Sequence, residues 1–243
     1  MASSSAVFKS TQQRRQFSYP IPVPNMKGSE PALEAGVSEI AMFTAASEVS
    51  TQKNINCLIE QSITRYQQVV KKAQVETIKI RGYISYVFGC PYENKVSNDI
   101  VTIIVLRLQD QGFYEISLGD TIGDGTPASA LAMVETVAQK IEIEQLAAHF
   151  HDTYGQGLAN IYAVLQAGIA ILDSSINSLG GCPYANGASG NVATEDLFYA
   201  LNGTHIDMDK LLIAGDYINQ FLGRQSTSRV ARALGNHTTY EQG

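Results

Sequence analysis

The sequence has few cysteines, few charges and no long apolar run. Its 243 residues include only three cysteines, Cys57, Cys90 and Cys182, and no two of them form a CxxC pair. A small, odd number of cysteines argues against a disulfide scaffold and for a reducing compartment, and the lack of CxxC argues against a zinc ribbon. No apolar stretch reaches the roughly 18 residues that a membrane-spanning helix needs, so we expect no membrane partner.

Charged residues make up 16% of the chain, and the net charge is −6. Nucleic acids and anionic membrane surfaces attract basic proteins, so we expect neither of them as a partner. Hydrophobic residues make up 44%, which is enough for a sizeable core. Low charge together with this length favours one large domain with a high interior fraction.

The apolar residues alternate between short continuous runs, typical of buried strands, and the 3.6-residue spacing of helices. The pattern predicts strands at 19–24, 39–44, 78–87, 114–118, 146–151 and 170–174. It predicts helices at 58–73, 97–111, 128–140, 155–167, 193–202 and 208–222. Helix followed by strand, repeated along the chain, indicates an α/β protein with a parallel sheet.

A parallel sheet is either open and doubly wound or closed as a barrel. The glycine-rich stretch here follows the last strand, whereas an open dinucleotide-binding sheet has it after the first. Polar residues follow the ends of several strands, and their convergence on one face is the TIM-barrel arrangement. Only about six of the eight βα units of such a barrel can be found, so we predict an incomplete TIM-barrel-type fold.

The segment "LAAHFHDTYG" contains the clearest candidate site. His149 and His151 are two residues apart in a predicted strand, so their side chains point to the same side. Paired imidazoles at a strand end favour a metal site over two buried structural histidines. The amide oxygen of Asn191 is a plausible third, hard ligand.

Cys182 lies in the glycine-rich stretch "GGCPYANGASGN" that precedes this asparagine. A flexible loop can bring a thiol over a neighbouring site, and a cysteine can act as acid or base when a metal or cation tunes its pKa. The alternative is an inert, buried cysteine. These residues together suggest a divalent metal with a mobile thiol above it, which suits carbonyl chemistry.

Several segments in order resemble the hydroxymethylglutaryl-CoA lyase family. They are "PNMKG", "AASE", "KNINC", "RGY", "GCPYE", "YEISLGDTIG", "HFHDTYGQGLAN", "LGGCPYANGASGNVATEDL" and "TSRVA". The resemblance runs over residues 18–233, which we take as a lyase-type barrel domain. Residues 234–243 are a tail, and residues 1–17 are unmatched, with a serine-rich and basic composition that fits either a disordered segment or a transit peptide.

The resemblance implies cleavage of 3-hydroxy-3-methylglutaryl-CoA to acetyl-CoA and acetoacetate, a reaction of leucine catabolism and ketone-body formation, with Mg²⁺ or Mn²⁺ as cofactor. It implies an acyl-CoA thioester as substrate, a homodimer, and a mitochondrial location, with the cytosol as the alternative. Metal ligands would be His149, His151 and Asn191. Catalytic residues would be Cys182 and His149, and residues lining or supporting the substrate site would be Asn25, Tyr83, Asp120 and Glu195.

The family's barrel begins with a "GPRDG" strand whose aspartate binds the metal and whose arginine stabilises the developing enolate. This sequence does not contain that motif, and its first strand resembles the family's third. The resemblance therefore implies that two βα units are missing and that turnover falls by several orders of magnitude. The alternative is a non-catalytic, truncated relative that binds CoA thioesters or a full-length subunit.

Overall fold

The computed structural model describes residues 4–11, 17–181, 189–202 and 206–235. Its main sheet consists of six parallel strands in the order β1-β2-β3-β6-β7-β8. They are β1 Ile21–Pro22, β2 Glu39–Ala45, β3 Lys79–Ser85, β6 Glu115–Asp120, β7 Leu146–Phe150 and β8 Ile171–Asp173. All six predicted strands are thus confirmed, and they pair in parallel, as expected for βα repeats.

Helices connect the strands and surround the sheet. They are α1 Ser4–Ser10, α2 Met26–Glu34, α3 Glu48–Ile55, α4 Ile59–Val75, α5 Asn98–Asp110, α6 Pro127–Ala138, α7 Gly157–Gln166, α8 Thr194–Leu201, α9 Met208–Leu222 and α10 Arg229–Gly235. The six predicted helices are confirmed; α1, α2, α3, α10 and the small antiparallel pair β4 (Gly89–Cys90) and β5 (Asn94–Lys95) were not predicted. Among the described residues, no helix has the length and apolar character of a membrane-spanning segment.

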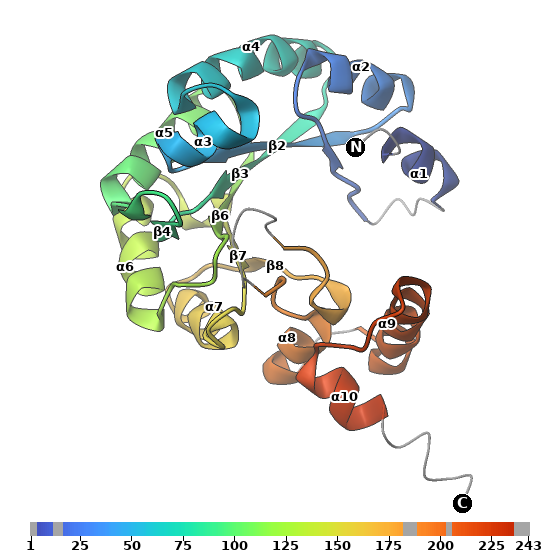
Figure 1. The fold of residues 1–243 in the computed structure, drawn as a ribbon. Coiled ribbons are helices and arrows are strands. Elements are labelled where there is room, and N and C mark those ends of the chain that lie inside the picture. Colours follow the sequence, from blue (N-terminus) through green and yellow to red (C-terminus); the bar gives the residue numbers. More distant parts are fainter. Residues whose placement is uncertain (1–3, 12–16, 182–188, 203–205, 236–243) are drawn as a thin grey trace, which may run out of the picture.

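The helices form an arc around the strands, and the arc stays open between α1 and α9 (Figure 1). This arrangement is a TIM-barrel-type α/β fold with six strands in its sheet. Each sheet edge, β1 and β8, has a neighbour on one side only within the described part of the chain. The incomplete barrel predicted from the pattern is what the structure shows.

The core lies between the sheet and its helices. Alternate residues of the central strands point outward and are almost fully buried, including Ile40, Met42, Ile84, Ile116, Leu118, Leu146 and Phe150. The other residues of each strand point to the opposite side, which we call the inner face. Polar residues on the inner face, rather than the apolar core, form the candidate site described below.

The third strand is shorter than predicted. It ends at Ser85 because Tyr86 has a φ of 63°, a left-handed conformation that breaks a strand. Tyr86 and Val87 are nevertheless fully buried, which explains the apolar run that extended the prediction to residue 87.

Candidate active site

His149 and His151 lie side by side at the end of β7. Their ring centroids are 5.6 Å apart, as their spacing in a strand predicts. His151 forms an isolated antiparallel bridge with Asn191, which brings the segment after the glycine-rich loop next to the strand end. The three predicted metal ligands are therefore contributed by two adjoining segments.

Three buried polar atoms of these residues have no hydrogen-bond partner: Nδ1 of His149, Nδ1 of His151 and Oδ1 of Asn191. The orientation of the asparagine amide is fixed, because its Nδ2 donates to the Leu179 carbonyl at 2.7 Å. Buried polar atoms are normally paired, and each exception calls for an explanation. The unpaired Nδ1 of His151 and Oδ1 of Asn191, with the imidazole of His149 beside them, form a donor set that a divalent cation would satisfy.

Burial lowers the pKa of His151 from 6.5 to about 4, and the neighbouring His149 adds to this effect. The imidazole of His151 is therefore neutral at physiological pH. A neutral imidazole has a free lone pair, which is the form that binds a metal ion.

A network of polar side chains covers the inner face beside the histidines. The Arg81 guanidinium donates to Glu115, to the Tyr83 hydroxyl and to Asp173, the last at 2.8 Å. Ser117 donates to the other oxygen of Asp173 at 2.6 Å. We call these five residues the inner network; they come from the adjacent strands β3 and β6 and from β8, which lies beyond β7.

Tyr83 links this network to the histidines. Its ring stacks on Phe43 at 4.7 Å between centroids and meets His149 edge-on at 6.2 Å. Burial raises the pKa of Tyr83 to about 12, and the charge of Asp173 adds to this although Arg81 opposes it. Tyr83 therefore stays protonated at neutral pH and cannot act as a base there.

Asp120 and Asn25 each use their side chain to hold a backbone segment, and the Asp120 carbonyl also accepts the His151 N–H at 3.3 Å. Asp120 is the strand partner of Phe150, so its side chain points away from the inner face. Its carboxylate accepts backbone N–H groups of Asp124 and Gly125 at 3.2 and 3.0 Å and thus holds the loop after β6. Asn25 caps α2, where it accepts from the Gly28 N–H at 3.1 Å.

Glu195 is fully buried at the start of α8. Both of its carboxylate oxygens accept the N–H of Asn177, each at 3.1 Å, and burial raises its pKa. Asn177 has a φ of 53° and is also held by Arg224, so Glu195 supports the segment leading into the glycine-rich loop. Cys182, the predicted catalytic thiol, lies outside the described residues.

The sequence alone assigned no role to Arg81, Asp173, Glu115 or Ser117. The available clue was the period-2 placement of polar residues in otherwise apolar strands: arginine and tyrosine in β3, glutamate and serine in β6. A strand that is buried on both sides normally has apolar residues throughout. A central strand in which polar and apolar residues alternate therefore indicates that the inner face of the sheet is polar.

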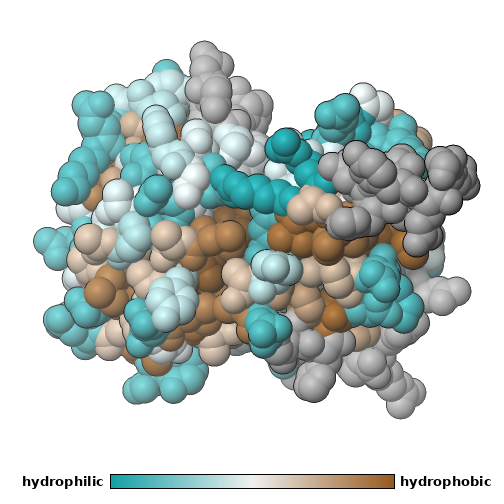
Figure 2. Space-filling view, turned by 90° about the horizontal axis from the view of Figure 1, so that it is seen from below, coloured by the Kyte–Doolittle hydropathy of each residue, from teal (hydrophilic) through white to brown (hydrophobic). Residues whose placement is uncertain are grey.

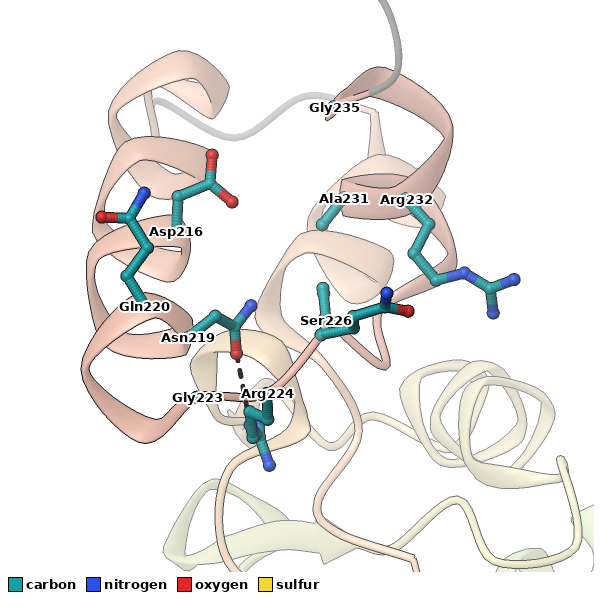
Figure 3. A pocket seen from close by; sticks show the side chains of 10 residues that line it. Asp216, Asn219, Gln220, Gly223, Arg224, Ser226, Ala231, Arg232 and Gly235 are labelled. Carbon is teal, nitrogen blue, oxygen red and sulfur yellow. Dashed lines mark hydrogen bonds between the residues drawn. The ribbon is translucent and has the colours of Figure 1, made fainter.

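Two cavities lie near the C-terminal helices. One of about 330 Å³ borders the site, with a lining that includes Gly180, Ser189 and Gly190 beside Asn191, and Asp152 beside His151. A larger one of about 600 Å³ lies between α9 and α10 and is lined by none of the predicted site residues (Figure 3). In it, Arg224 donates to Asn219 at 3.2 Å.

No group of three or more His, Cys, Asp or Glu side chains that could hold a metal lies within the described segments. The candidate centre has two such residues, and its third donor is an amide. The fold and the site thus define a TIM-barrel-type protein with a histidine pair and an asparagine at its strand ends.

Comparison with known proteins identifies the family. The HMGL-like family model matches residues 3–216. A 3-hydroxy-3-isohexenylglutaryl-CoA/hydroxy-methylglutaryl-CoA lyase of Pseudomonas aeruginosa is 51% identical over 96% of this chain and 79% of its own length. A mitochondrial hydroxymethylglutaryl-CoA lyase of Mus musculus is 50% identical over 96% of this chain and 73% of its own.

The fold agrees with these sequences. The crystal structure of hydroxymethylglutaryl-CoA lyase from Pseudomonas aeruginosa matches with a TM-score of 0.94 and 50% identity, covering 98% of this chain and 80% of that one. The chain belongs to the HMGL-like family. The proteins to which it is similar are hydroxymethylglutaryl-CoA lyases, which are carbon-carbon lyases.

Proposed function

We propose that this chain catalyses metal-dependent cleavage of 3-hydroxy-3-methylglutaryl-CoA to acetyl-CoA and acetoacetate. The observation that carries the proposal is the convergence of His149, His151 and Asn191, where the buried Nδ1 of His151 and Oδ1 of Asn191 have no hydrogen-bond partner. The names of relatives about 50% identical to the chain support the same chemistry. Cleavage breaks the bond between C2 and C3: the C3 hydroxyl loses its proton and becomes a ketone, and the bonding electrons pass to acetyl-CoA, whose C2 takes up a proton.

The donor set fits Mg²⁺ or Mn²⁺. His149 and His151 would supply imidazole nitrogens and Asn191 an amide oxygen. Such mixed nitrogen and oxygen donors suit Mn²⁺, and the amide oxygen is a hard ligand of the kind Mg²⁺ requires. A bound divalent ion would polarise the substrate oxygen and stabilise the charge that develops on it.

The chain's own residues would prepare the substrate. The stacked rings of Phe43 and Tyr83 form a wall beside His149 that can exclude water from one side of the acyl group. Arg81 holds the Tyr83 hydroxyl, so this ring is fixed in place. His149 lies where it can hold or move a proton near the reacting oxygen.

Cys182 remains the predicted acid that protonates C2 of the departing acetyl-CoA. Its position in a glycine-rich loop supports delivery of the thiol when the loop closes over substrate. The "GPRDG" motif of the family is not in this sequence. We therefore expect turnover to be slow compared with that of a relative which has the motif.

The test is a product assay on the purified chain. Formation of acetyl-CoA from 3-hydroxy-3-methylglutaryl-CoA should require Mg²⁺ or Mn²⁺ and be lost after chelation. It should also be lost in Cys182→Ala and His151→Ala, and Tyr162→Phe on the outside of α7, a residue 63% exposed, is a matched control that should not change it. Cleavage that persists after chelation would refute the proposal.

The same assay can include 3-hydroxy-3-isohexenylglutaryl-CoA, because the bacterial relative is named for both substrates. The products place the proposed reaction in leucine catabolism and ketone-body formation. The name of the mouse relative supports a mitochondrial location, and the similarity to a bacterial protein gives that location no support. The location stays a prediction.

A further inference from the structure

Asp173 faces His149 from the neighbouring strand. The two residues are register partners in the parallel pair of β7 and β8, and Oδ2 of Asp173 lies 3.7 Å from Nδ1 of His149. This distance is slightly beyond hydrogen-bond range, so a small rotation of the imidazole would close the contact. The Nδ1 atom is buried and has no hydrogen-bond partner.

The carboxylate of Asp173 is held on both oxygens. Arg81 binds Oδ1 at 2.8 Å and Ser117 binds Oδ2 at 2.6 Å. The group facing His149 is therefore a fixed carboxylate and not a mobile one.

The charges of the inner network allow the Asp173 carboxylate to accept a further hydrogen bond. Arg81 is the single cation, and it contacts two carboxylates, Glu115 and Asp173. One negative charge thus remains uncompensated within the network. Glu115 lies two positions before Ser117 on β6, which places it about 7 Å further from the strand ends. The carboxylate whose negative charge faces His149 is therefore that of Asp173.

We propose that Asp173 is a positioning residue for His149: its Oδ2 accepts the Nδ1–H of the imidazole, which fixes the Nδ1–H tautomer and leaves Nε2 free to bind a metal ion. Carboxylates that accept the N–H of a metal-binding histidine commonly orient the imidazole in this way and raise its basicity. Arg81 and Ser117 serve this arrangement by fixing the carboxylate. The inference deepens the proposed function, since the role of Nε2 rests on a metal ion at the histidines.

The first test needs no metal. Long-range ¹H–¹⁵N spectra of the metal-free full chain at pH 8 report the tautomer of His149, which a His149→Gln variant assigns. We expect the Nδ1–H tautomer in the wild type and its loss or mixing in Asp173→Asn. Glu115→Gln, which alters the other carboxylate on Arg81, should leave the tautomer unchanged. An Nε2–H tautomer in the wild type, or equal effects of both variants, would overturn the inference.

Mn²⁺ affinity gives the second test and separates the two proposals. We expect Asp173→Asn to weaken Mn²⁺ binding by about 10- to 100-fold and Glu115→Gln to change it by less than twofold. A wild type that shows the expected tautomer but binds no Mn²⁺ would contradict the proposed function alone, while the positioning of His149 would stand. If Asp173→Asn does not fold, Ser117→Ala, which removes one hydroxyl from Oδ2, should still mix the tautomers; an unchanged tautomer there would count against the inference.

Discussion

At the residue scale, His151 gives the molecule a specific pH dependence. The unfolded chain protonates this histidine near pH 6.5, whereas the folded chain does so only near pH 4. Unfolded protein therefore binds more protons between these values, so the stability present above pH 6.5 is lost as the pH falls towards 4. Between pH 7 and pH 5 the loss should be about 2 kcal/mol.

Asp120 acts in the opposite direction, because burial raises its pKa to about 7, with the charge of Asp124 adding to this and the Gly125 N–H opposing it. The contribution of His151 is therefore isolated as the difference between wild type and His151→Asn. Urea unfolding of both metal-free proteins at pH 7 and pH 5 measures it. A difference that does not change with pH would show that His151 is not held neutral.

Arg81 should be the most sensitive residue of the inner network. Its side chain is 7% exposed and lies between two carboxylates. Arg81→Met leaves both of them buried without a counter-charge, which should cost about 3–5 kcal/mol in the free energy of unfolding. Arg107→Ala is the control: its ion pair with Glu60 is more than half exposed, so its loss should cost less than about 1 kcal/mol. Equal costs would mean that the network is solvated.

At the scale of elements, Gly190 in the glycine-rich segment has no room for a side chain. A Cβ on Gly190 would lie 1.8 Å from the Ser178 carbonyl oxygen and 2.6 Å from that of Gly180, whereas one on Gly181 would come no nearer than 3.9 Å to the Ser189 carbonyl oxygen. Backbone atoms cannot rotate away, so Gly190→Ala must displace the neighbouring Asn191.

We expect Gly190→Ala to destabilise the chain by about 3 kcal/mol and to abolish Mn²⁺ binding, with Gly181→Ala close to wild type in both. Thermal unfolding and Mn²⁺ titration measure the two effects. Mn²⁺ binding retained by Gly190→Ala would indicate that Asn191 does not need its present position.

Elements with strong periodicity were predictable from the sequence, and short ones were not. The apolar stripe of α4 predicted both that a helix forms there and which of its sides is buried, and Ile63, Tyr66 and Val70 on that stripe are buried. By contrast, α3 has few apolar residues and depends on its Ser47 cap and its packing on β2 and α4, which are tertiary contacts that a linear pattern does not show.

The same distinction applies to the site. The neighbouring placement of His149 and His151 followed from strand geometry alone. The contacts of Arg81 with Glu115 and Asp173 join three strands through their register, and register is decided by packing across the whole sheet. The structure was needed to find them.

At the scale of the whole molecule, apolar surface remains exposed. Ile213, Tyr217 and Phe221 are 67%, 72% and 83% exposed and lie four residues apart on α9, so they form one stripe. In the view from below, hydrophobic residues also form a broad band across the surface (Figure 2). Sheet edges without a neighbour and large apolar patches both promote association.

We therefore expect the chain to self-associate at micromolar concentration, in keeping with the predicted homodimer. Light scattering coupled to size exclusion should show the mass rising with protein concentration. The double variant Ile213→Asp with Phe221→Asp should reduce this rise, and Tyr162→Ser on α7 should not. A monomer at all concentrations would show that the α9 stripe is not an association surface.

The central claim is that His149, His151 and Asn191 form a divalent metal site. The most direct measurement is a titration of the metal-free full chain with Mn²⁺, followed by electron paramagnetic resonance, in the wild type and in His151→Ala. We predict one saturable Mn²⁺ site per chain in the wild type and its loss in the variant. No saturable site in the wild type, or an unchanged site in His151→Ala, would contradict the claim.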